Sequence, residues 1–84
     1  EEEAVAIAND SEYGLSGGIY TTDLSRAFRV AREMRTGTVG VNGYSAMPNS
    51  PAGGIKRSGL GREGGWTTVE EFTELKTVML NLAA

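Results

Sequence analysis

The sequence predicts an α/β fold, and three observations support this prediction. Residues 15–21 and residues 38–42 have the glycine-rich, β-branched and apolar character of short buried strands. An amphipathic helix is predicted between them, starting after Asp23 and ending before Gly37. Strand, helix and strand within about thirty residues form a βαβ unit, whose right-handed crossover places the two strands parallel.

Two helices are predicted in the first half of the chain. In residues 1–9, an acidic first turn precedes apolar side chains at helical spacing, which favours a short helix. In the second helix, an apolar stripe is predicted to face the core: Leu24, Ala27, Phe28, Ala31 and Met34. Arginines recur every three residues on its other side, at positions 26, 29, 32 and 35. On an acidic chain we interpret them as a solvated face and not as a nucleic-acid surface.

Composition limits the possible functions. A chain of 84 residues allows one small domain with a modest core. Its net charge of −3 argues against nucleic acid or an anionic membrane as the main partner. It has no cysteine and no histidine, so it offers neither a thiol nucleophile nor the commonest metal ligand. No apolar run is long enough to span a membrane, and we expect a cytoplasmic location.

The second half predicts a loop, a glycine run, a helix and a strand. Residues 43–50 have neither helical nor strand periodicity. Two overlapping capping boxes, which begin at Thr67 and Thr68, predict a helix that continues to about Glu74. Residues 75–82 are β-prone and partly apolar on both faces, so this strand needs a partner. Pairing within the chain and pairing with another part of a longer protein or another subunit are both open.

The glycine run at residues 51–63 is the strongest candidate for a functional site. It holds four glycines, three cations, one hydroxyl and one carboxylate in thirteen residues. A tight backbone can hold the polar side chains of Lys56, Ser58, Arg62 and Glu63 in fixed directions, as binding or catalysis requires. A structural connection with a solvated charge cluster is the alternative. Glu63 is suited either to relaying protons in a cleft or to pairing with a neighbouring cation.

Other chemical patterns are weaker. Residues 59–64 match the dinucleotide fingerprint G-x-G-x-x-G, but at least eight loop residues separate the run from the preceding strand. A Rossmann site is therefore disfavoured, although a separate phosphate- or nucleotide-binding module stays an alternative. We interpret Glu70, Glu71 and Glu74 as helix caps and solvated side chains, not as a metal cluster.

Taken in order, the motifs resemble the C-terminal end of an NAD(P)-dependent aldehyde dehydrogenase. The matching blocks, apart from the arginine-rich helix, are ND-x-x-YGL at 9–15, GTV-x-VN at 37–42, P-x-GG-x-K-x-SG-x-GRE at 51–63 and EFTE-x-KTV at 71–78. The resemblance implies an α/β segment: residues 1–74 as the C-terminal βαβ part of the catalytic domain, and residues 75–84 as a terminal oligomerisation strand.

The resemblance also implies an activity for a longer parent protein. That parent would oxidise an aldehyde to a carboxylic acid with NAD or NADP through a cysteine thioester. The cysteine and the cofactor domain would lie outside this chain, so the 84 residues alone would be inactive. The implied partners are the rest of the parent chain, the aldehyde and further copies in a homo-oligomer, with no nucleic acid and no membrane.

Site residues follow from the same resemblance. Glu63 matches the proton-relay position, and the loop that contains Tyr44, Met47 and Ala52 would line the substrate channel. The backbone carbonyls of Lys56 and Gly59 correspond to a monovalent-cation site in some members. At positions 47 and 52 many members carry aromatic residues, so substrate choice does not transfer. An interaction segment that docks through its terminal strand is a further alternative.

Overall fold

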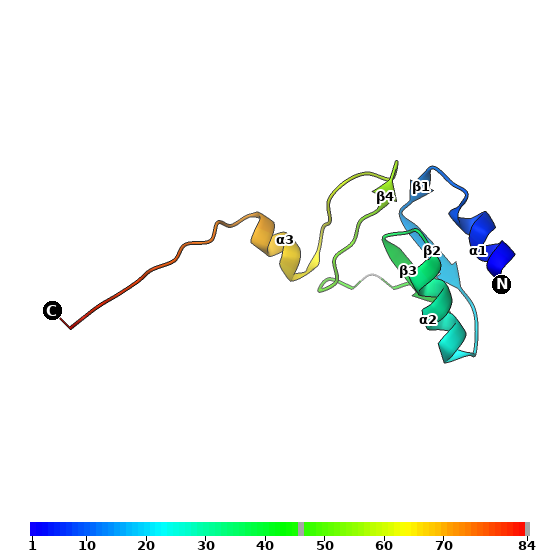
Figure 1. Ribbon diagram of the computed structural model, residues 1–84, viewed down its shortest axis with the longest axis horizontal. Coiled ribbons are helices and arrows are strands. Elements are labelled where there is room, and N and C mark those ends of the chain that lie inside the picture. The colour runs from blue at the N-terminus through cyan, green and yellow to red at the C-terminus, as the bar shows by residue number, and fades with distance from the viewer. Residues whose placement is uncertain (46, 84) are drawn as a thin grey trace.

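The predicted βαβ unit is present in the computed structural model, which describes residues 1–45 and 47–83. Strands β2 (Ser16–Ile19) and β3 (Thr38–Val41) are paired in parallel, with Ser16 opposite Thr38 and Ile19 opposite Val41. Helix α2 (Leu24–Glu33) connects them and lies along the two strands (Figure 1). The α/β prediction is therefore confirmed for this part of the chain.

Helix α2 begins where the sequence predicts, but only part of its predicted apolar stripe faces the sheet. The Asp23 carboxylate accepts a hydrogen bond from the third N–H of the helix at 3.2 Å, as an N-cap does. Ala27 and Val30 are buried against the strands. Leu24 and Phe28 were expected in the core, but their exposed fractions are 72% and 58%. That expectation was wrong because a two-stranded sheet covers only one side of the helix.

Helix α1 (Glu2–Asn9) is attached to α2 at both ends. At its start, the carboxylate of Glu1 forms ion pairs with Arg26 Nε at 3.1 Å and with Arg29 Nε at 2.7 Å. At its end, Asn9 Nδ2 donates a hydrogen bond to the last carbonyl of α2 at 2.9 Å. Two of the three arginines within α2 thus hold a neighbouring helix, in keeping with a partly solvated face.

A second, antiparallel pair of strands connects the beginning of the chain to the glycine run. Strand β1 (Tyr13–Gly14) pairs with β4 (Ile55–Lys56), and Gly14 lies opposite Ile55. These strands could not be predicted from the sequence, because two residues are too few to show a period. They place the run beside the βαβ unit (Figure 1).

Helix α3 (Gly65–Glu71) begins and ends earlier than the sequence predicts. Its N-cap is Gly64, whose φ is 75°, and no side chain caps the helix. The two predicted capping boxes are therefore wrong, because Thr67 and Thr68 lie inside the helix. Thr68 instead donates its hydroxyl hydrogen to the Gly64 carbonyl at 2.7 Å.

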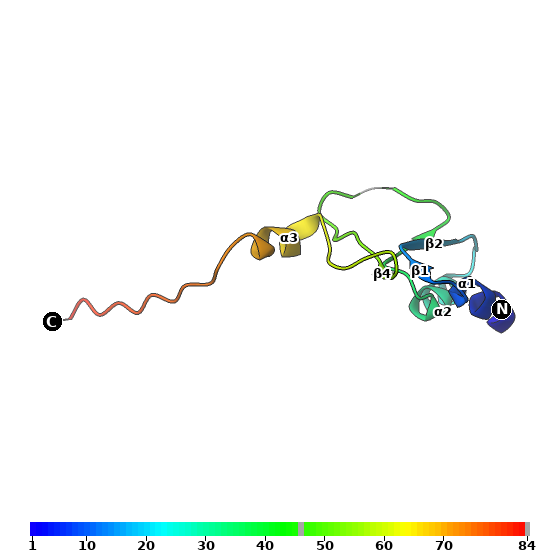
Figure 2. The ribbon, with the colours of Figure 1, turned by 90° about the horizontal axis from the view of Figure 1, so that it is seen from above.

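Beyond α3 the chain runs extended and away from the other elements (Figures 1 and 2). The strand predicted over residues 75–82 pairs with no other described segment. Its apolar side chains are exposed: Leu75 at 103%, Val78 at 75% and Leu80 at 76%. Pairing within the chain, one of the two alternatives, is thus not seen in the described residues. Among these residues no helix has both the length and the hydropathy to cross a membrane.

Gly37 is expected to be essential for folding because the glycine run passes close to it. A Cβ at Gly37 would lie 1.6 Å from the carbonyl oxygen of Gly53, whereas at Gly18 the nearest atom would be 3.7 Å away. We expect Gly37→Ala to lower the free energy of unfolding by about 2–3 kcal/mol through this overlap. Gly18→Ala, the matched control, should change it by less than about 1 kcal/mol. Urea unfolding of the full-length protein measures both, and equal effects would contradict the close approach.

The attachment of α1 is expected to depend on pH. The hydrogen bond from Arg29 is the main reason that the pKa of Glu1 falls from 4.5 to about 2. Since this folded-state pKa lies below the unfolded value, the stabilisation is present above about pH 4.5 and is lost as the pH falls towards 2. NMR titration of the Glu1 carboxyl should show the low pKa. Arg29→Gln should raise it and Arg32→Gln should not; a wild-type pKa at the ordinary value would refute the pairing.

Candidate functional site

The glycine run folds into a closed loop with a fixed shape. Its two ends meet at an antiparallel bridge, in which Ala52 N–H donates to the Glu63 carbonyl at 2.6 Å and Glu63 N–H donates to the Ala52 carbonyl at 2.7 Å. Within the loop, Arg62 Nη1 donates to the carbonyls of Gly54 and Gly61, both at 2.8 Å. The guanidinium thus holds two backbone carbonyls of the loop in place. The loop has the tight, fixed backbone that its glycines predict.

The loop is anchored to the segment around β1 by both side chains and backbone. Ser58 Oγ accepts a hydrogen bond from the buried Gly14 N–H at 2.9 Å. Lys56, whose φ is 56°, donates from Nζ to the carbonyls of Asn9 and Ser11 at 3.0 and 3.1 Å. Such a left-handed conformation in a residue with a Cβ is kept only where the surroundings enforce it. The ammonium group therefore fixes the loop tip against the end of α1.

The buried Gly54 lets the loop lie directly on β1. A Cβ at this position would come within 2.6 Å of Ser58 Cβ and 3.1 Å of the Gly14 carbonyl oxygen. The first distance is too short for a Cβ, and the second would require the neighbouring backbone to shift by a few tenths of an ångström. Glycine at position 54 therefore suits both the turn at Ser58 and the close approach to β1.

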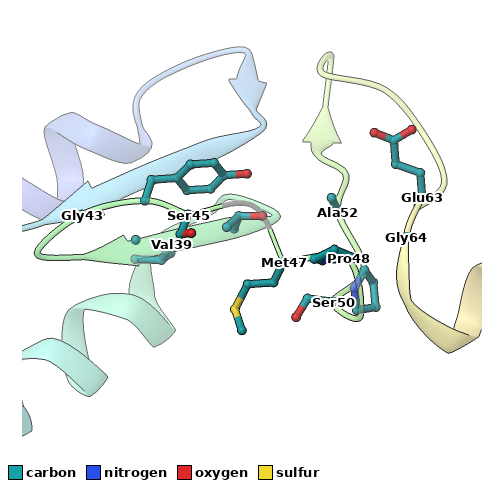
Figure 3. Close-up of a pocket in the computed structure, with 13 residues that line it drawn as sticks. Val39, Gly43, Ser45, Met47, Pro48, Ser50, Ala52, Glu63 and Gly64 are labelled. Carbon is teal, nitrogen blue, oxygen red and sulfur yellow. The ribbon is translucent and has the colours of Figure 1, made fainter.

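A cavity of about 560 Å³ lies between β3 and the bridged end of the loop. Four predicted site residues line it together: Tyr44, Met47, Ala52 and Glu63. Figure 3 shows Met47 in the segment after β3, and Ala52 and Glu63 in the two bridged segments of the loop. The volume lies within the range of small-molecule pockets, about 300–1,000 Å³.

Asn42 sets the direction of the segment that carries Tyr44 and Met47. It ends β3 with a φ of 58°, which turns the chain sharply. Its side chain is held by two hydrogen bonds to Thr21, from Thr21 N–H at 2.8 Å and to the Thr21 carbonyl at 2.9 Å. The ends of both parallel strands are thus locked together where the cavity begins.

Glu63 stands at the edge of two hollows. Besides the first cavity it lines a second, of about 650 Å³, together with Arg62 and Glu71. In Figure 3 its carboxylate points away from Met47. The ion pairs of the described residues do not include Glu63, and the Arg62 guanidinium bonds to carbonyl oxygens instead. Of the two interpretations of Glu63, pairing with its neighbouring cation is therefore not what the structure shows.

Lys56 and Gly59, the predicted cation ligands, lie apart from the other four residues. Neither lines the two cavities. The Lys56 carbonyl accepts a hydrogen bond from the Gly59 N–H at 3.3 Å, which leaves it one free lone pair. No cluster of three or more possible side-chain ligands occurs in the described parts of the chain. The carbonyl-based cation site stays a prediction.

Several lining residues were not singled out from the sequence. Thr38, Val39 and Gly40 of β3 and Gly64 after the bridge also line the first cavity. The rule that ligand sites in α/β folds lie beyond the carboxyl ends of parallel strands would not have found the first three, because they begin β3. Gly64 gives no sequence signal either, since its place depends on a long-range bridge.

A βαβ unit with a cavity between its strand β3 and a shaped loop is typical of a segment of an α/β ligand-binding or catalytic domain. The model of the aldehyde dehydrogenase family matches residues 1–78. The chain belongs to the aldehyde dehydrogenase family, which consists of oxidoreductases. This confirms the resemblance found in the motifs.

Individual relatives agree. The chain is 52% identical over 80 residues to geranial dehydrogenase of Castellaniella defragrans, covering 95% of this chain and 17% of that protein. It is 48% identical over 83 residues to betaine aldehyde dehydrogenase of Rhizobium leguminosarum bv. trifolii, covering 98% and 17%. Among solved structures, the NAD+ complex of a Mycobacterium tuberculosis aldehyde dehydrogenase superposes with a TM-score of 0.85 at 50% identity, covering 100% of this chain and 17% of that one. The chain thus spans about a sixth of its relatives.

The anchoring of the loop through Ser58 leads to a testable expectation. Ser58→Ala leaves the buried Gly14 N–H without its acceptor, so the free energy of unfolding should fall by about 1–3 kcal/mol. Ser50→Ala, which removes an exposed hydroxyl, should cost less than about 0.5 kcal/mol. Denaturant unfolding of the full-length protein compares the two. If both variants are equally stable, the loop is not held at Gly14.

Proposed function

We propose that this chain is the C-terminal part of an enzyme that oxidises an aldehyde to a carboxylic acid with NAD(P)+. The observation that carries the proposal is the family match over residues 1–78. The cavity adds support, because it brings together Tyr44, Met47, Ala52 and Glu63. Residues 1–74 are assigned to the catalytic domain and residues 75–84 to a terminal oligomerisation strand.

The residues of this chain do not fit a dinucleotide cradle. In the fingerprint fold a strand leads straight into the glycines and a helix follows them. Here the G-x-G-x-x-G at residues 59–64 follows a turn, and Glu63 within it is bridged to Ala52. We therefore assign the cofactor site to the rest of the protein and derive no step through it. The same argument weighs against a separate nucleotide-binding module.

The covalent chemistry is likewise assigned to residues outside this chain. Formation of a thioester needs a thiolate, and the chain has no cysteine. Alone, the 84 residues are therefore expected to be inactive. Their contribution is one wall of the aldehyde channel and the carboxylate of Glu63.

Glu63 is proposed to relay a proton behind the catalytic site. Its backbone is fixed by the bridge to Ala52, while its carboxylate stands at the border of two hollows and forms no ion pair with the described cations. A carboxylate whose backbone is fixed and whose oxygens are not held in an ion pair can accept a proton on one side and release it on the other.

The terminal strand is proposed to join the sheet of another subunit in a homo-oligomer. Support comes from its exposed apolar side chains, among them Leu75 and Leu80. Its extended backbone also presents N–H and C=O groups that can pair with another strand. Docking through this strand, which the sequence left as a separate alternative, becomes part of the same proposal.

Activity of the full-length protein tests the function. Purified enzyme should produce NAD(P)H from an aldehyde, and Glu63→Gln should lower kcat by about 10- to 100-fold through loss of proton transfer. Glu70→Gln on the exposed surface of α3 is the control and should stay within about twofold. The pH dependence of kcat should change only in Glu63→Gln. Absence of NAD(P)H with every aldehyde would refute the function, and normal kcat in Glu63→Gln would refute the role of Glu63.

A further inference from the structure

Apart from Glu63, the described residues that line the cavity are uncharged, and several of them are small. Glycine or serine occupies positions 40, 43, 45 and 50, and alanine occupies position 52. The larger side chains in the wall are mostly apolar: Val39, Tyr44, Met47, Pro48 and Pro51. Such a surface gains free energy by removing apolar ligand area from water and offers little to a charged ligand.

A cationic aldehyde would find little to bind it on the Met47 side of this cavity. Recognition of a quaternary ammonium group needs several aromatic faces or a facing carboxylate. Tyr44 is the one aromatic residue among the described lining residues, and Glu63 is the one charged residue. The Glu63 carboxylate points away from the Met47 side of the cavity (Figure 3). Among the described lining residues, the Met47 side of the cavity therefore offers neither several aromatic faces nor a facing carboxylate.

Gly40 and Ala52 are both small residues of the cavity wall, but the fold excludes a larger side chain only at Gly40. At Gly40 a Cβ would lie 2.4 Å from the Gly43 carbonyl oxygen, so the fold itself requires glycine there. Ala52 is only half-buried and already carries a Cβ that faces the cavity region in Figure 3. A larger side chain at position 52 would therefore take up cavity volume without requiring a different backbone.

Met47 gives the wall an adaptable apolar surface. Its side chain is 63% exposed and lies beside the cavity in Figure 3. An unbranched thioether adjusts to irregular apolar groups more readily than a ring does. With Ala52 across from it, this side chain can contact a ligand of considerable width.

We propose that the channel takes an uncharged aldehyde with a large apolar group, and that Ala52 sets the upper limit of that group's size. The inference rests on the proposed aldehyde dehydrogenase activity and adds its substrate class. The apolar group would lie between Met47 and Ala52, where it displaces water from both sides of the cavity.

A panel of three aldehydes tests the class on the full-length wild-type enzyme. Octanal represents a large apolar aldehyde, acetaldehyde a small one and betaine aldehyde a cationic one. We expect kcat/KM for octanal to exceed each of the others at least tenfold. Preference for acetaldehyde or betaine aldehyde would overturn the substrate class while leaving the proposed function intact. Oxidation of none of the three would count against the proposed function itself.

Variants at position 52 test the size limit. Ala52→Val and Ala52→Phe should lower the ratio of kcat/KM for octanal to that for acetaldehyde in that order, with about a tenfold fall in the phenylalanine variant. The ratio cancels any general loss of active enzyme, and the valine variant is the milder change if phenylalanine prevents folding. A ratio that is unchanged or higher in the variants would overturn the role of Ala52.

Discussion

The site depends on backbone packing between the glycine run and the rest of the chain. Where the turn after α2 passes the run, there is room for Gly37 but not for a Cβ, because the Gly53 backbone lies against it. Gly54 lies close to both Ser58 and the Gly14 carbonyl oxygen of β1. Such close contacts leave few alternative arrangements. They place the Ala52–Glu63 bridge across the cavity from β3, and every proposed role of these residues follows from that placement.

The small core of the chain has a physical meaning for its function. In the described residues, the buried hydrophobic core consists of Ala27 and Val30. Three aromatic side chains, by contrast, are exposed: Phe28 at 58%, Trp66 at 72% and Phe72 at 86%. Apolar surface of this extent is rarely left to water in a soluble protein. It is expected in a segment that packs on a larger body, in agreement with a chain that spans about a sixth of its relatives.

The sequence predicted those elements whose pattern is local. The βαβ unit was predictable because helical and strand periods persist over several residues, and Asp23 marked the start of α2. Strands β1 and β4 were not, because pairing over two residues leaves no period. The start of α3 was predicted too late, because the sequence pattern places helix caps at Thr67 and Thr68. The helix is instead capped by Gly64, whose φ is positive. The cavity residues from the loop were predictable from motif resemblance, but the meeting of Ala52 with Glu63 depends on a long-range bridge.

A crystal structure of the full-length enzyme with a bound long-chain carboxylate, the reaction product, tests the central claim most directly. The account predicts that the Ala52–Glu63 bridge is intact and that the ligand's apolar chain is in van der Waals contact with Met47 and Ala52. A ligand bound elsewhere, or a glycine run packed away from Gly37, would contradict it.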